Sequence, residues 1–480
     1  MDYDVAVIGA GVVGSAIARE LSRYRLDVAL IDSAEDVAMG ASRANSAIVH
    51  AGYDCVPGTL MARLNVRGNE LYDSWCRDLD VPLKRIGTLV VAFGSEDEKE
   101  LYNLLDRGIK NGVPDLKIIS GDEAREMEPM LSPEVTAALY AGTGAITCPY
   151  EMTIACAENA RLNGVKWLLG SPVTAIEPRE DGLYVTAGIY NLKAGYVINA
   201  AGVHADEVAR LIGDDSFSIK ARKGEYMLLD RTAADLKKVI FQTPSKMGKG
   251  VLVSPTVDGN SFAGPTAVDI ADKEDTSVCA ASIDELTRLA RKSAPCLNLR
   301  AVITSFAGVR AQPSTGDFII RPSDVDRRMV FASGICSPGL SSAPAIAEEI
   351  VKILGDLGAK LDKKPFFDPE RQHIKAFRHM TEEEKKAAIA ESPLYGRVIC
   401  RCETITEAEI VEAIRRGARS IDGVKRRTRA GMGRCQGGFC SPRVMEILSR
   451  EAGIPMEDIT KFGAGSKLVV GKTREDGENA

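Results

Sequence analysis

The sequence predicts an α/β nucleotide-binding domain interleaved with an α+β domain built on an antiparallel sheet, followed by a small α-rich module at the C-terminal end. Three observations predict this fold class. An apolar run at 4–8 leads into a glycine-rich turn and a helical pattern. Segments of alternating polarity separate later apolar runs. Four of the eleven cysteines fall in two pairs in the last quarter of the chain.

The first three elements form a βαβ unit. DVAVI is a continuous apolar run and predicts a buried parallel strand, GAGVVGSAIARELSRY has helical periodicity, and DVALID predicts a second buried strand. Two later runs, YVINAAG at 196–202 and RRMVFASG at 327–334, predict further buried strands. The alternating segments GTLVVAF, GLYVTAG and EYMLLD indicate that a second, antiparallel sheet domain interrupts the parallel one.

Domain boundaries follow from these patterns and from changes in composition. The segment 361–395 is charged and rich in proline, and it predicts a linker with a short helix. The tail at 456–480 ends in Gly, Lys and Glu and is expected to be mobile. We expect a nucleotide-binding domain from 1–78, 150–215 and 309–360, a substrate domain from 79–149 and 216–308, and a cysteine module at 396–455.

Composition excludes several classes of protein. The net charge of −6 gives no general attraction to nucleic acid or to an anionic membrane. No apolar run approaches the ~18 residues of a membrane-spanning helix, and no basic segment precedes the first apolar run as in a signal peptide. We therefore expect a cytoplasmic protein without disulfides. The cysteines outside the two pairs are expected to be buried apolar residues: Cys55, Cys76, Cys148, Cys156, Cys279, Cys296 and Cys336.

The glycine-rich turn predicts a dinucleotide site. Gly9, Gly11 and Gly14 give G-x-G-x-x-G between a strand and a helix, where a diphosphate can lie at the helix N-terminus. Asp32 ends the second strand and can bind ribose hydroxyls. The fingerprint alone allows FAD or NAD. Its position at the start of the chain and the small residues of NAAGVHA at 199–205 favour FAD, and the lack of a second fingerprint predicts no separate NAD site.

The two cysteine pairs predict a metal centre. Cys400 and Cys402 are followed, after 32 residues, by Cys435 and Cys440. Four thiolates so spaced bind a [2Fe–2S] cluster or zinc, and C-x-C is unusual for structural zinc. Between 397 and 443 there are eleven Arg or Lys and five Asp or Glu, which suits a negative cluster. A nucleic-acid patch is disfavoured because stacking aromatics are nearly absent. The candidate arginines beside the cluster are Arg401, Arg429, Arg434 and Arg443.

These segments resemble known families. Residues 1 to about 355 resemble the D-amino-acid-oxidase-like FAD enzymes. NSAIVHAGYDCVPGTLMARLNVRGN, RKGEYMLL and FAGVRAQPSTGDFII resemble L-2-hydroxyglutarate dehydrogenases and oxidases. CRCETITEAEI and RRTRAGMGRCQGGFC resemble the C-terminal part of the large subunit of anaerobic glycerol-3-phosphate dehydrogenase. This module is similar to the bacterioferritin-associated-ferredoxin-like domain, which favours a [2Fe–2S] cluster over zinc or unliganded thiols.

The resemblance implies roles for particular residues. His50, in AIVHAG, corresponds to a segment beside the flavin, and an imidazole with a pKa of about 6.5 suits a general base. The alternative is a histidine that only hydrogen-bonds backbone or flavin. Arg310, in AGVRAQ, is the expected catalytic anion holder over the flavin face, against the alternative of a structural ion pair. Tyr53 and Lys223 are weaker candidates for the substrate pocket.

Further residues are expected to contact the flavin cofactor. SPGLSSAP predicts a turn that begins a helix, whose N–H groups can face a flavin carbonyl and stabilise the reduced flavin. From this turn we assign Gly339, Leu340 and Ser341 to the FAD site. The resemblance adds Ser33, Ser42, Asn45, Ser46, Val173, Ala200, Gly202 and Gly308 to this site.

Together these features predict a dehydrogenase in which FAD oxidises a small anionic secondary alcohol and a [2Fe–2S] cluster passes the electrons on. sn-Glycerol 3-phosphate is favoured by the module architecture. L-2-hydroxyglutarate stays open because SPGLSSAP stands where glycerol-3-phosphate dehydrogenases usually carry a phosphate-binding lysine. Amine or imino-acid oxidation and a non-catalytic iron–sulfur flavoprotein are further alternatives. The expected acceptor is a second redox subunit, a flavoprotein or ferredoxin-like protein, through which alone the chain would associate with a membrane.

Overall fold

The computed structural model describes residues 2–244 and 250–471 and divides the chain into two compact units. The first unit holds Met1–Ser33 and Val37–Arg371, and the second holds Ala34–Asp36 and Gln372–Ala480. Residues 472–480, the end of the predicted mobile tail, lie outside the described part of the chain. Among the described residues, none of the helices has both the length and the apolar character needed to cross a bilayer.

The central strand of the first sheet is β1 (Asp2–Ile8), the predicted apolar run. Its neighbours β2 (Val28–Ile31) and β12 (Tyr190–Asn199) run parallel to it. Because its residues from Val5 to Ile8 are buried, both faces of the strand are covered, as its continuous apolar pattern predicts. Other strands extend the sheet: β9 (Lys166–Leu168), β10 (Val173–Arg179), β11 (Gly182–Ala187), β19 (Ile319–Pro322) and β20 (Met329–Ser333).

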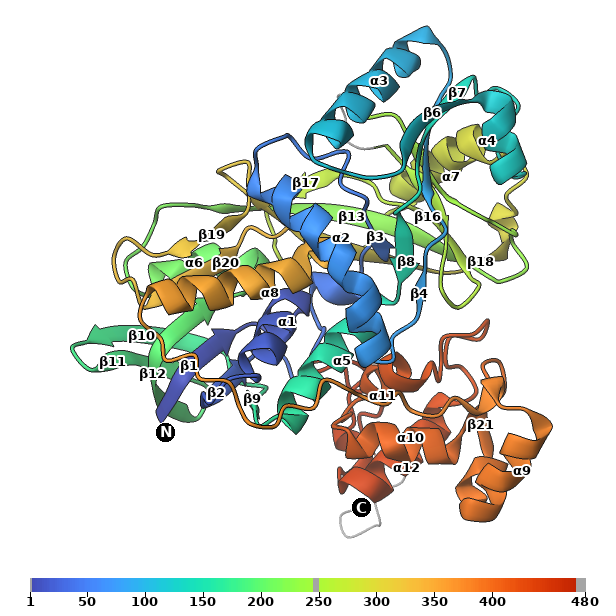
Figure 1. The fold of residues 1–480 in the computed structure, drawn as a ribbon. Coiled ribbons are helices and arrows are strands. Elements are labelled where there is room, and N and C mark those ends of the chain that lie inside the picture. Colours follow the sequence, from blue (N-terminus) through green and yellow to red (C-terminus); the bar gives the residue numbers. More distant parts are fainter. Residues whose placement is uncertain (1, 245–249, 472–480) are drawn as a thin grey trace. The chain divides into compact units, whose positions relative to one another are not determined.

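Helices cover both faces of this sheet. α1 (Val12–Leu21), α5 (Pro149–Leu162) and α8 (Gly339–Asp356) pack on one face and share one hydrophobic core (Figure 1). The short helix α6 (Ala205–Arg210) packs on the other face. The segment GLYVTAG forms β11, which joins this sheet as part of an antiparallel hairpin with β10 and does not contribute to the second sheet.

A second sheet forms the other half of this unit and is antiparallel except where β14 pairs with β5. β13 (Ile219–Leu229) and β18 (Val302–Pro313) pair along their whole lengths. The other strands are β5 (Thr88–Ala92), β6 (Leu116–Ser120), β7 (Ala137–Ala141), β14 (Val239–Gln242), β15 (Leu252–Pro255), β16 (Ser261–Gly264) and β17 (Val268–Ile270). Its helices are α3 (Ser95–Lys110), α4 (Gly121–Met127) and α7 (Ala280–Ser293). The fold class predicted from the sequence is confirmed.

Two further pieces join the halves of this unit. The strands β3 (Ile48–Val49), β4 (Leu83–Lys84) and β8 (Ala145–Thr147) form a small sheet. The long helix α2 (Leu60–Asp78) packs against α8. α2 begins at the Thr59 cap, whose side chain accepts a hydrogen bond from the Ala62 N–H. Helix α2 therefore fixes the start of α8, where the flavin-facing turn is expected.

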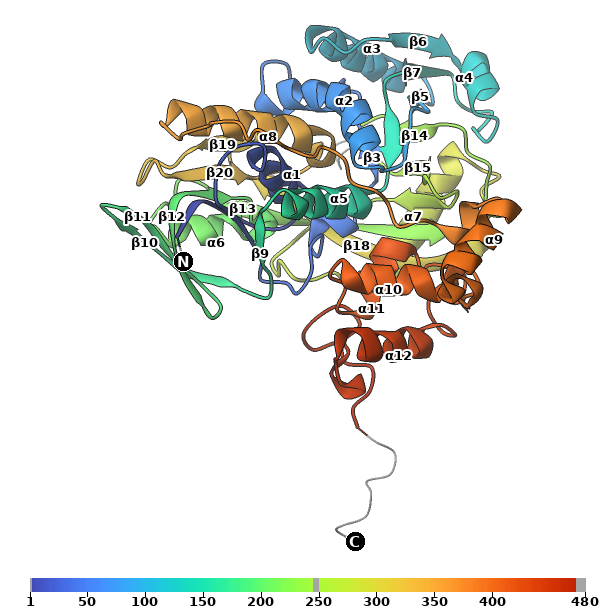
Figure 2. The same ribbon diagram turned by 60° about the horizontal axis from the view of Figure 1, so that its bottom comes forward.

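The second unit is small and mainly helical, with a core of its own. α10 (Glu407–Arg415) begins with a capping box at Thr406 and Glu409 and contacts α12 (Ser441–Ala452) (Figure 2). Ile459, in the predicted tail, is fully buried in this core. Its other elements are α9 (Glu382–Glu391), inside the predicted linker, α11 (Ile421–Thr428), β21 (Val398–Cys400) and β22 (Ile405–Thr406).

Candidate functional site

The glycine-rich turn lies against the end of β12. Gly9 has a φ of +107°, and a Cβ there would lie 2.3 Å from the carbonyl oxygen of Ala200. A Cβ on Gly14 would lie 1.9 Å from the carbonyl oxygen of Gly9, so α1 can approach the turn only through a glycine. Gly11 caps α1. The turn therefore fits the diphosphate of a dinucleotide at a helix N-terminus.

Two polar side chains fix this turn. The Ala10 N–H donates to Oδ2 of Asp32 over 2.6 Å, so this carboxylate lies beside the turn at the end of β2. The Val12 N–H donates to Oγ of Ser42 over 2.9 Å. Asp32 and Ser42 thus both lie beside the glycine-rich turn, and their contacts with the cofactor stay a prediction.

The segment 42–50 runs from this turn to the second sheet. The Ala44 carbonyl lies so close to Gly308 on β18 that a Cβ there would be 1.9 Å from its oxygen. The Ser46 hydroxyl lies 3.2 Å from that of Tyr226 on β13. Asn45 supports the bend, because its Oδ1 accepts a hydrogen bond from the Ala47 N–H. These contacts bring the predicted residues of this segment beside β13 and β18.

His50 ends the segment and is held through its backbone. Its N–H donates to the hydroxyl of Ser341 over 2.7 Å, and its carbonyl accepts a hydrogen bond of 3.0 Å from Asn69 on α2. The Ser341 hydroxyl donates in turn to the Ile48 carbonyl over 3.3 Å. The imidazole centroid lies 5.8 Å from that of Phe241. His50 is therefore tied to the start of α8, where Gly339, Leu340 and Ser341 lie.

Arg310 lies on β18 opposite Arg222 of β13. Its Nη2 donates to the Thr266 carbonyl over 2.6 Å, and Nε and Nη2 make 3.4 Å hydrogen bonds to carbonyls of β13. It makes no ion pair within the part of the chain that the structure describes, contrary to the structural-salt-bridge alternative. Because its known partners are backbone carbonyls, its full positive charge remains available to an anion.

Tyr226 lies near Arg310 and Ser46 and was not among the predicted site residues. Its ring stacks on Phe306 at a centroid distance of 4.8 Å, and its hydroxyl meets Ser46. Burial raises the pKa of Tyr226, although the nearby Arg310 guanidinium opposes this shift. The hydroxyl therefore stays protonated and can donate a hydrogen bond near Arg310. The segment EYMLLD indicated only a strand.

Other predicted site residues have different surroundings. The ammonium group of Lys223 is 2.7 Å from Oδ2 of Asp275 and donates to the Ser277 hydroxyl over 3.3 Å. Tyr53 is buried in a hydrophobic cluster with residues of α3, and burial raises its pKa. These contacts occupy the Lys223 ammonium and bury the Tyr53 ring. Ser33 is the second residue after β2, Val173 begins β10, Ala200 follows β12, and Gly202 begins a 3₁₀ turn to His204.

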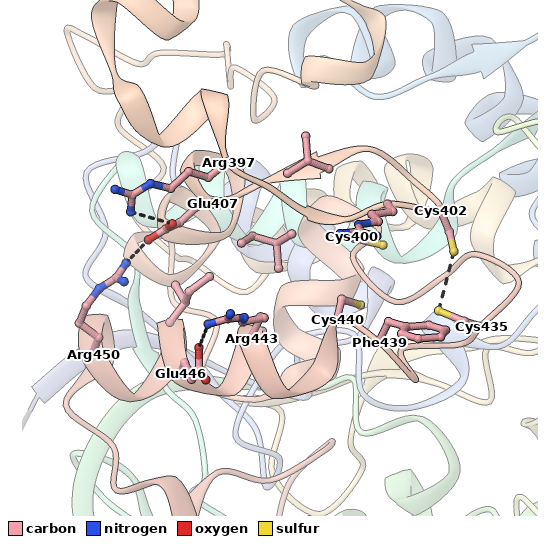
Figure 3. Close-up of a pocket in the computed structure, with 14 residues that line it drawn as sticks. Arg397, Cys400, Cys402, Glu407, Cys435, Phe439, Cys440, Arg443, Glu446 and Arg450 are labelled. Carbon is pink, nitrogen blue, oxygen red and sulfur yellow. Dashed lines mark hydrogen bonds and ion pairs between the residues drawn. The ribbon is translucent and has the colours of Figure 1, made fainter.

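The four predicted metal ligands line one hollow of about 850 Å³ in the second unit (Figure 3). They form two close pairs, each with one member from either motif. Cys402 Sγ lies 3.8 Å from Cys435 Sγ, and Cys400 is hydrogen-bonded to Cys440. Across the residues described, no cluster of three His, Cys, Asp or Glu side chains has metal-site geometry. The four sulfurs therefore lie in two separate pairs along the lining of this hollow.

The surroundings of these sulfurs suit a negatively charged cluster. The hydrogen bond from Cys440, together with the backbone N–H groups of Gly431 and Glu403, lowers the pKa of the Cys400 thiol to about 6 despite burial. The backbone N–H of Phe439 lowers the pKa of Cys435. The backbone N–H donors would remain available to ligating thiolates, whereas the Cys440 thiol, whose pKa is raised by its bond with Cys400, would lose its proton and that bond on ligation. The donor set therefore fits the predicted cluster.

A buried carboxylate, that of Glu403, holds the chain directly after Cys402 in place. Glu403 follows Cys402 and has 5% exposure of its side chain. Its Oε2 accepts hydrogen bonds from Arg378 over 2.8 Å and from Arg429 over 3.0 Å. Arg429, a predicted neighbour of the cluster, is thus linked through Glu403 to the chain directly after Cys402. Glu403 and Arg378 were not among the predicted residues, because 25 residues separate them along the chain.

Arginines line the rest of the hollow. Arg401 and Arg443, two of the predicted neighbours, take part in its lining, whereas Arg434 is exposed nearby in the chain. Arg397 and Arg450 both donate to Glu407, over 3.3 and 2.6 Å. Burial alone would raise the pKa of Glu407, but these two partners outweigh it and hold the pKa below its usual value.

Comparisons with known proteins agree with both halves of this description. Residues 4–353 match the model of the DAO family, described as FAD dependent oxidoreductase, and residues 398–450 match the BFD-like [2Fe-2S] binding domain. A glycerol 3-phosphate dehydrogenase of Caloramator mitchellensis is 48% identical over 99% of both chains. A mitochondrial L-2-hydroxyglutarate dehydrogenase of Arabidopsis thaliana is 30% identical over 72% of this chain and 82% of its own.

Among solved structures, L-alpha-glycerophosphate oxidase from Mycoplasma pneumoniae, determined with FAD bound, is similar with a TM-score of 0.74 and 35% identity. The match covers 77% of this chain and 98% of the oxidase, so about a quarter of this chain has no counterpart there. The resemblances predicted from the sequence, to both dehydrogenase groups and to the [2Fe–2S] module, are confirmed.

Proposed function

We propose a reaction from one premise: this chain belongs to the FAD dependent oxidoreductase family and carries a BFD-like [2Fe-2S] binding domain near its C-terminal end. The proposed reaction is the oxidation of sn-glycerol 3-phosphate to dihydroxyacetone phosphate, with electrons passed to a partner redox subunit. When bound, FAD supplies the hydride acceptor for this chemistry and the [2Fe–2S] cluster supplies a one-electron outlet.

One observation carries the choice of substrate. The relative named glycerol 3-phosphate dehydrogenase matches this chain over 99% of both lengths, and therefore includes the cysteine module. The relative named L-2-hydroxyglutarate dehydrogenase is less similar, at 30% identity over 72% of this chain. A shared module at the electron outlet also favours a dehydrogenase over a free-standing oxidase.

His50 is the proposed general base. A neutral imidazole can accept the proton of the substrate hydroxyl as the carbon loses its hydride. The His50 N–H donates to the Ser341 hydroxyl and the His50 carbonyl accepts from the Asn69 amide, which fixes the position of this residue on both sides. Such fixation supports the role, since proton transfer depends strongly on the distance and direction between base and hydroxyl.

Arg310 is the proposed holder of the substrate anion. Its Nε and Nη2 are hydrogen-bonded to backbone carbonyls, which orients the planar guanidinium without neutralising its charge. The Tyr226 hydroxyl provides a second donor near this group. This charge supports a phosphate or carboxylate substrate, and the choice between them rests on the full-length relative.

Anaerobic titration of the holoprotein tests the proposal. We expect sn-glycerol 3-phosphate to bleach the flavin absorbance, and L-2-hydroxyglutarate to do so far less. His50→Gln should slow this bleaching by at least about 100-fold, the usual contribution of a general base, while FAD content stays unchanged. His204→Gln is the matched control, because His204 is bound to Glu207 and Glu274 on the surface. Equal bleaching of wild type and His50→Gln would refute the base, and faster bleaching by L-2-hydroxyglutarate would refute the substrate.

A further inference from the structure

The hollow in the second unit extends well beyond its cysteines. In Figure 3 the four cysteines occupy one end, and Arg397, Glu407 and Arg450 occupy the other. Arg443 lies between these groups and is paired with Glu446 over 2.8 Å. The same hollow therefore joins the predicted cluster site to a group of cations.

The cations exceed the anions in this lining. Four arginines stand against two glutamates. Glu407 forms ion pairs with two of the arginines, and Glu446 forms an ion pair with a third. Arg401, directly before the ligand Cys402, is exposed and makes no ion pair with the described residues. Arg401 is thus the arginine of this lining whose charge no described carboxylate pairs, while the four cysteine thiolates would carry negative charge beside it when they ligate.

Exposed apolar side chains border the cysteines. Phe439 precedes Cys440 and is 88% exposed, and Val398 is 43% exposed. Cys402 is also exposed, so one sulfur pair lies at the protein surface. Exposed aromatic and arginine side chains are the residue types that dominate binding energy in protein interfaces.

We propose that this face, defined by Arg401, Phe439 and Arg443, docks an acidic one-electron carrier protein. The proposal rests on the proposed function, for which it specifies the partner. A carboxylate of the carrier would pair with Arg401, and Phe439 would be covered at the centre of the contact. Each encounter would transfer one electron: a reduced [2Fe–2S] cluster held by the four cysteines would supply it, and the carrier's oxidised centre would accept it. Small, charged contacts of this kind are typical of electron-transfer complexes.

Binding and electron transfer to two haem proteins test the proposal without the proposed substrate. The holoprotein is titrated with oxidised cytochrome b5, which is acidic, and with cytochrome c, which is basic. Dithionite-reduced holoprotein, freed of excess reductant, is then mixed with each, and haem reduction is followed by stopped flow. Because dithionite supplies the electrons, failure of the substrate assignment does not affect the result.

We expect cytochrome b5 to bind more tightly than cytochrome c and to be reduced faster, with a rate that falls as salt is added. Arg401→Gln and Phe439→Ala should each weaken binding and slow reduction of cytochrome b5 by about threefold or more. Arg415→Gln, an exposed arginine at the end of α10, is the matched control and should change neither. Iron content should be that of wild type in all three variants.

Several outcomes would overturn the proposal. One is that Arg415→Gln and Arg401→Gln change the binding and reduction of cytochrome b5 equally. Another is that cytochrome c is reduced faster than cytochrome b5. The third is that Arg401→Gln and Phe439→Ala both bind cytochrome b5 as tightly as wild type does. Sedimentation of the holoprotein alone tests another occupant of the face. A dimer that Phe439→Ala dissociates would assign the face to a second copy of this chain.

Discussion

Replacing Gly68 by alanine should destabilise the first unit, although alanine favours helices. Gly68 lies inside α2, and its added Cβ would be 2.0 Å from the carbonyl oxygen of Ser341 and 2.9 Å from Cα of Ser342. Both neighbours are backbone atoms at the start of α8. They cannot rotate away as a side-chain end can, so the two helices must separate.

The magnitude follows from two opposing effects. Alanine gains about 1 kcal/mol over glycine in a helix interior. Relieving a contact of 2.0 Å requires movement of about 1 Å between packed helices, and overpacking typically costs about 1–3 kcal/mol or more. Because backbone takes the strain, we expect the upper end of this range and a net loss of about 2 kcal/mol. The Ser341–His50 hydrogen bond would shift with α8.

Thermal unfolding and FAD titration of the variant check this prediction. A net loss of about 2 kcal/mol should lower the Tm of this large unit by about 2–3 °C, since the entropy of unfolding grows with the number of residues. FAD affinity should fall as well, since α8 begins in the expected flavin site. Gly355→Ala on α8 is the matched control, because its Cβ would meet only the end of the Leu361 side chain at 3.2 Å. A Gly68→Ala protein as stable as wild type, with unchanged FAD affinity, would show that the close approach does not constrain the fold.

Three further changes test the second unit. Glu403→Gln removes the charge of a buried carboxylate between two arginines, so the free energy of unfolding measured in urea should fall by about 3 kcal/mol. Glu412→Gln, at a surface ion pair, is the control and should lower it by under about 1 kcal/mol. Glu407 has a lowered pKa in the folded state, so its stabilisation is present above its unfolded pKa of about 4.3 and is lost as pH falls through the folded value. Glu407→Gln should therefore lower stability at pH 7 by under about 1 kcal/mol and at pH 3 hardly at all, and an equal loss at both values would contradict the charge pairing. Cys435→Ser should remove iron and acid-labile sulfide while FAD content stays as in wild type, and parallel loss of FAD would contradict independent sites.

The sequence predicted those features that depend on local spacing. The strand, the glycine turn, α1 and Asp32 follow one another within the βαβ unit, and a turn of this geometry needs glycine at fixed positions. The two cysteine pairs likewise carry their signal in short intervals. His50 was proposed only because its segment resembles known enzymes, and its backbone contacts with Ser341 and Asn69 cross 291 and 19 residues.

Features that depend on distant pairing were not predictable from such patterns. Lys223 was assigned to the substrate pocket, but its neighbour Asp275 lies 52 residues away and no local pattern marks it. Tyr226 and Arg310 meet only because β13 and β18 pair along their whole lengths. The close approach at Gly68 likewise requires knowing that α2 crosses the start of α8.

The segment 42–50 is attached at both ends and in its middle: Ser42 to the glycine turn, Ser46 to Tyr226, and His50 to Ser341. A run fixed at three points has no spare length. One inserted or deleted residue would move His50 relative to Arg310 or pull Ser42 from the turn. This run therefore cannot change length without altering the position of the proposed base relative to the anion holder or to the glycine-rich turn.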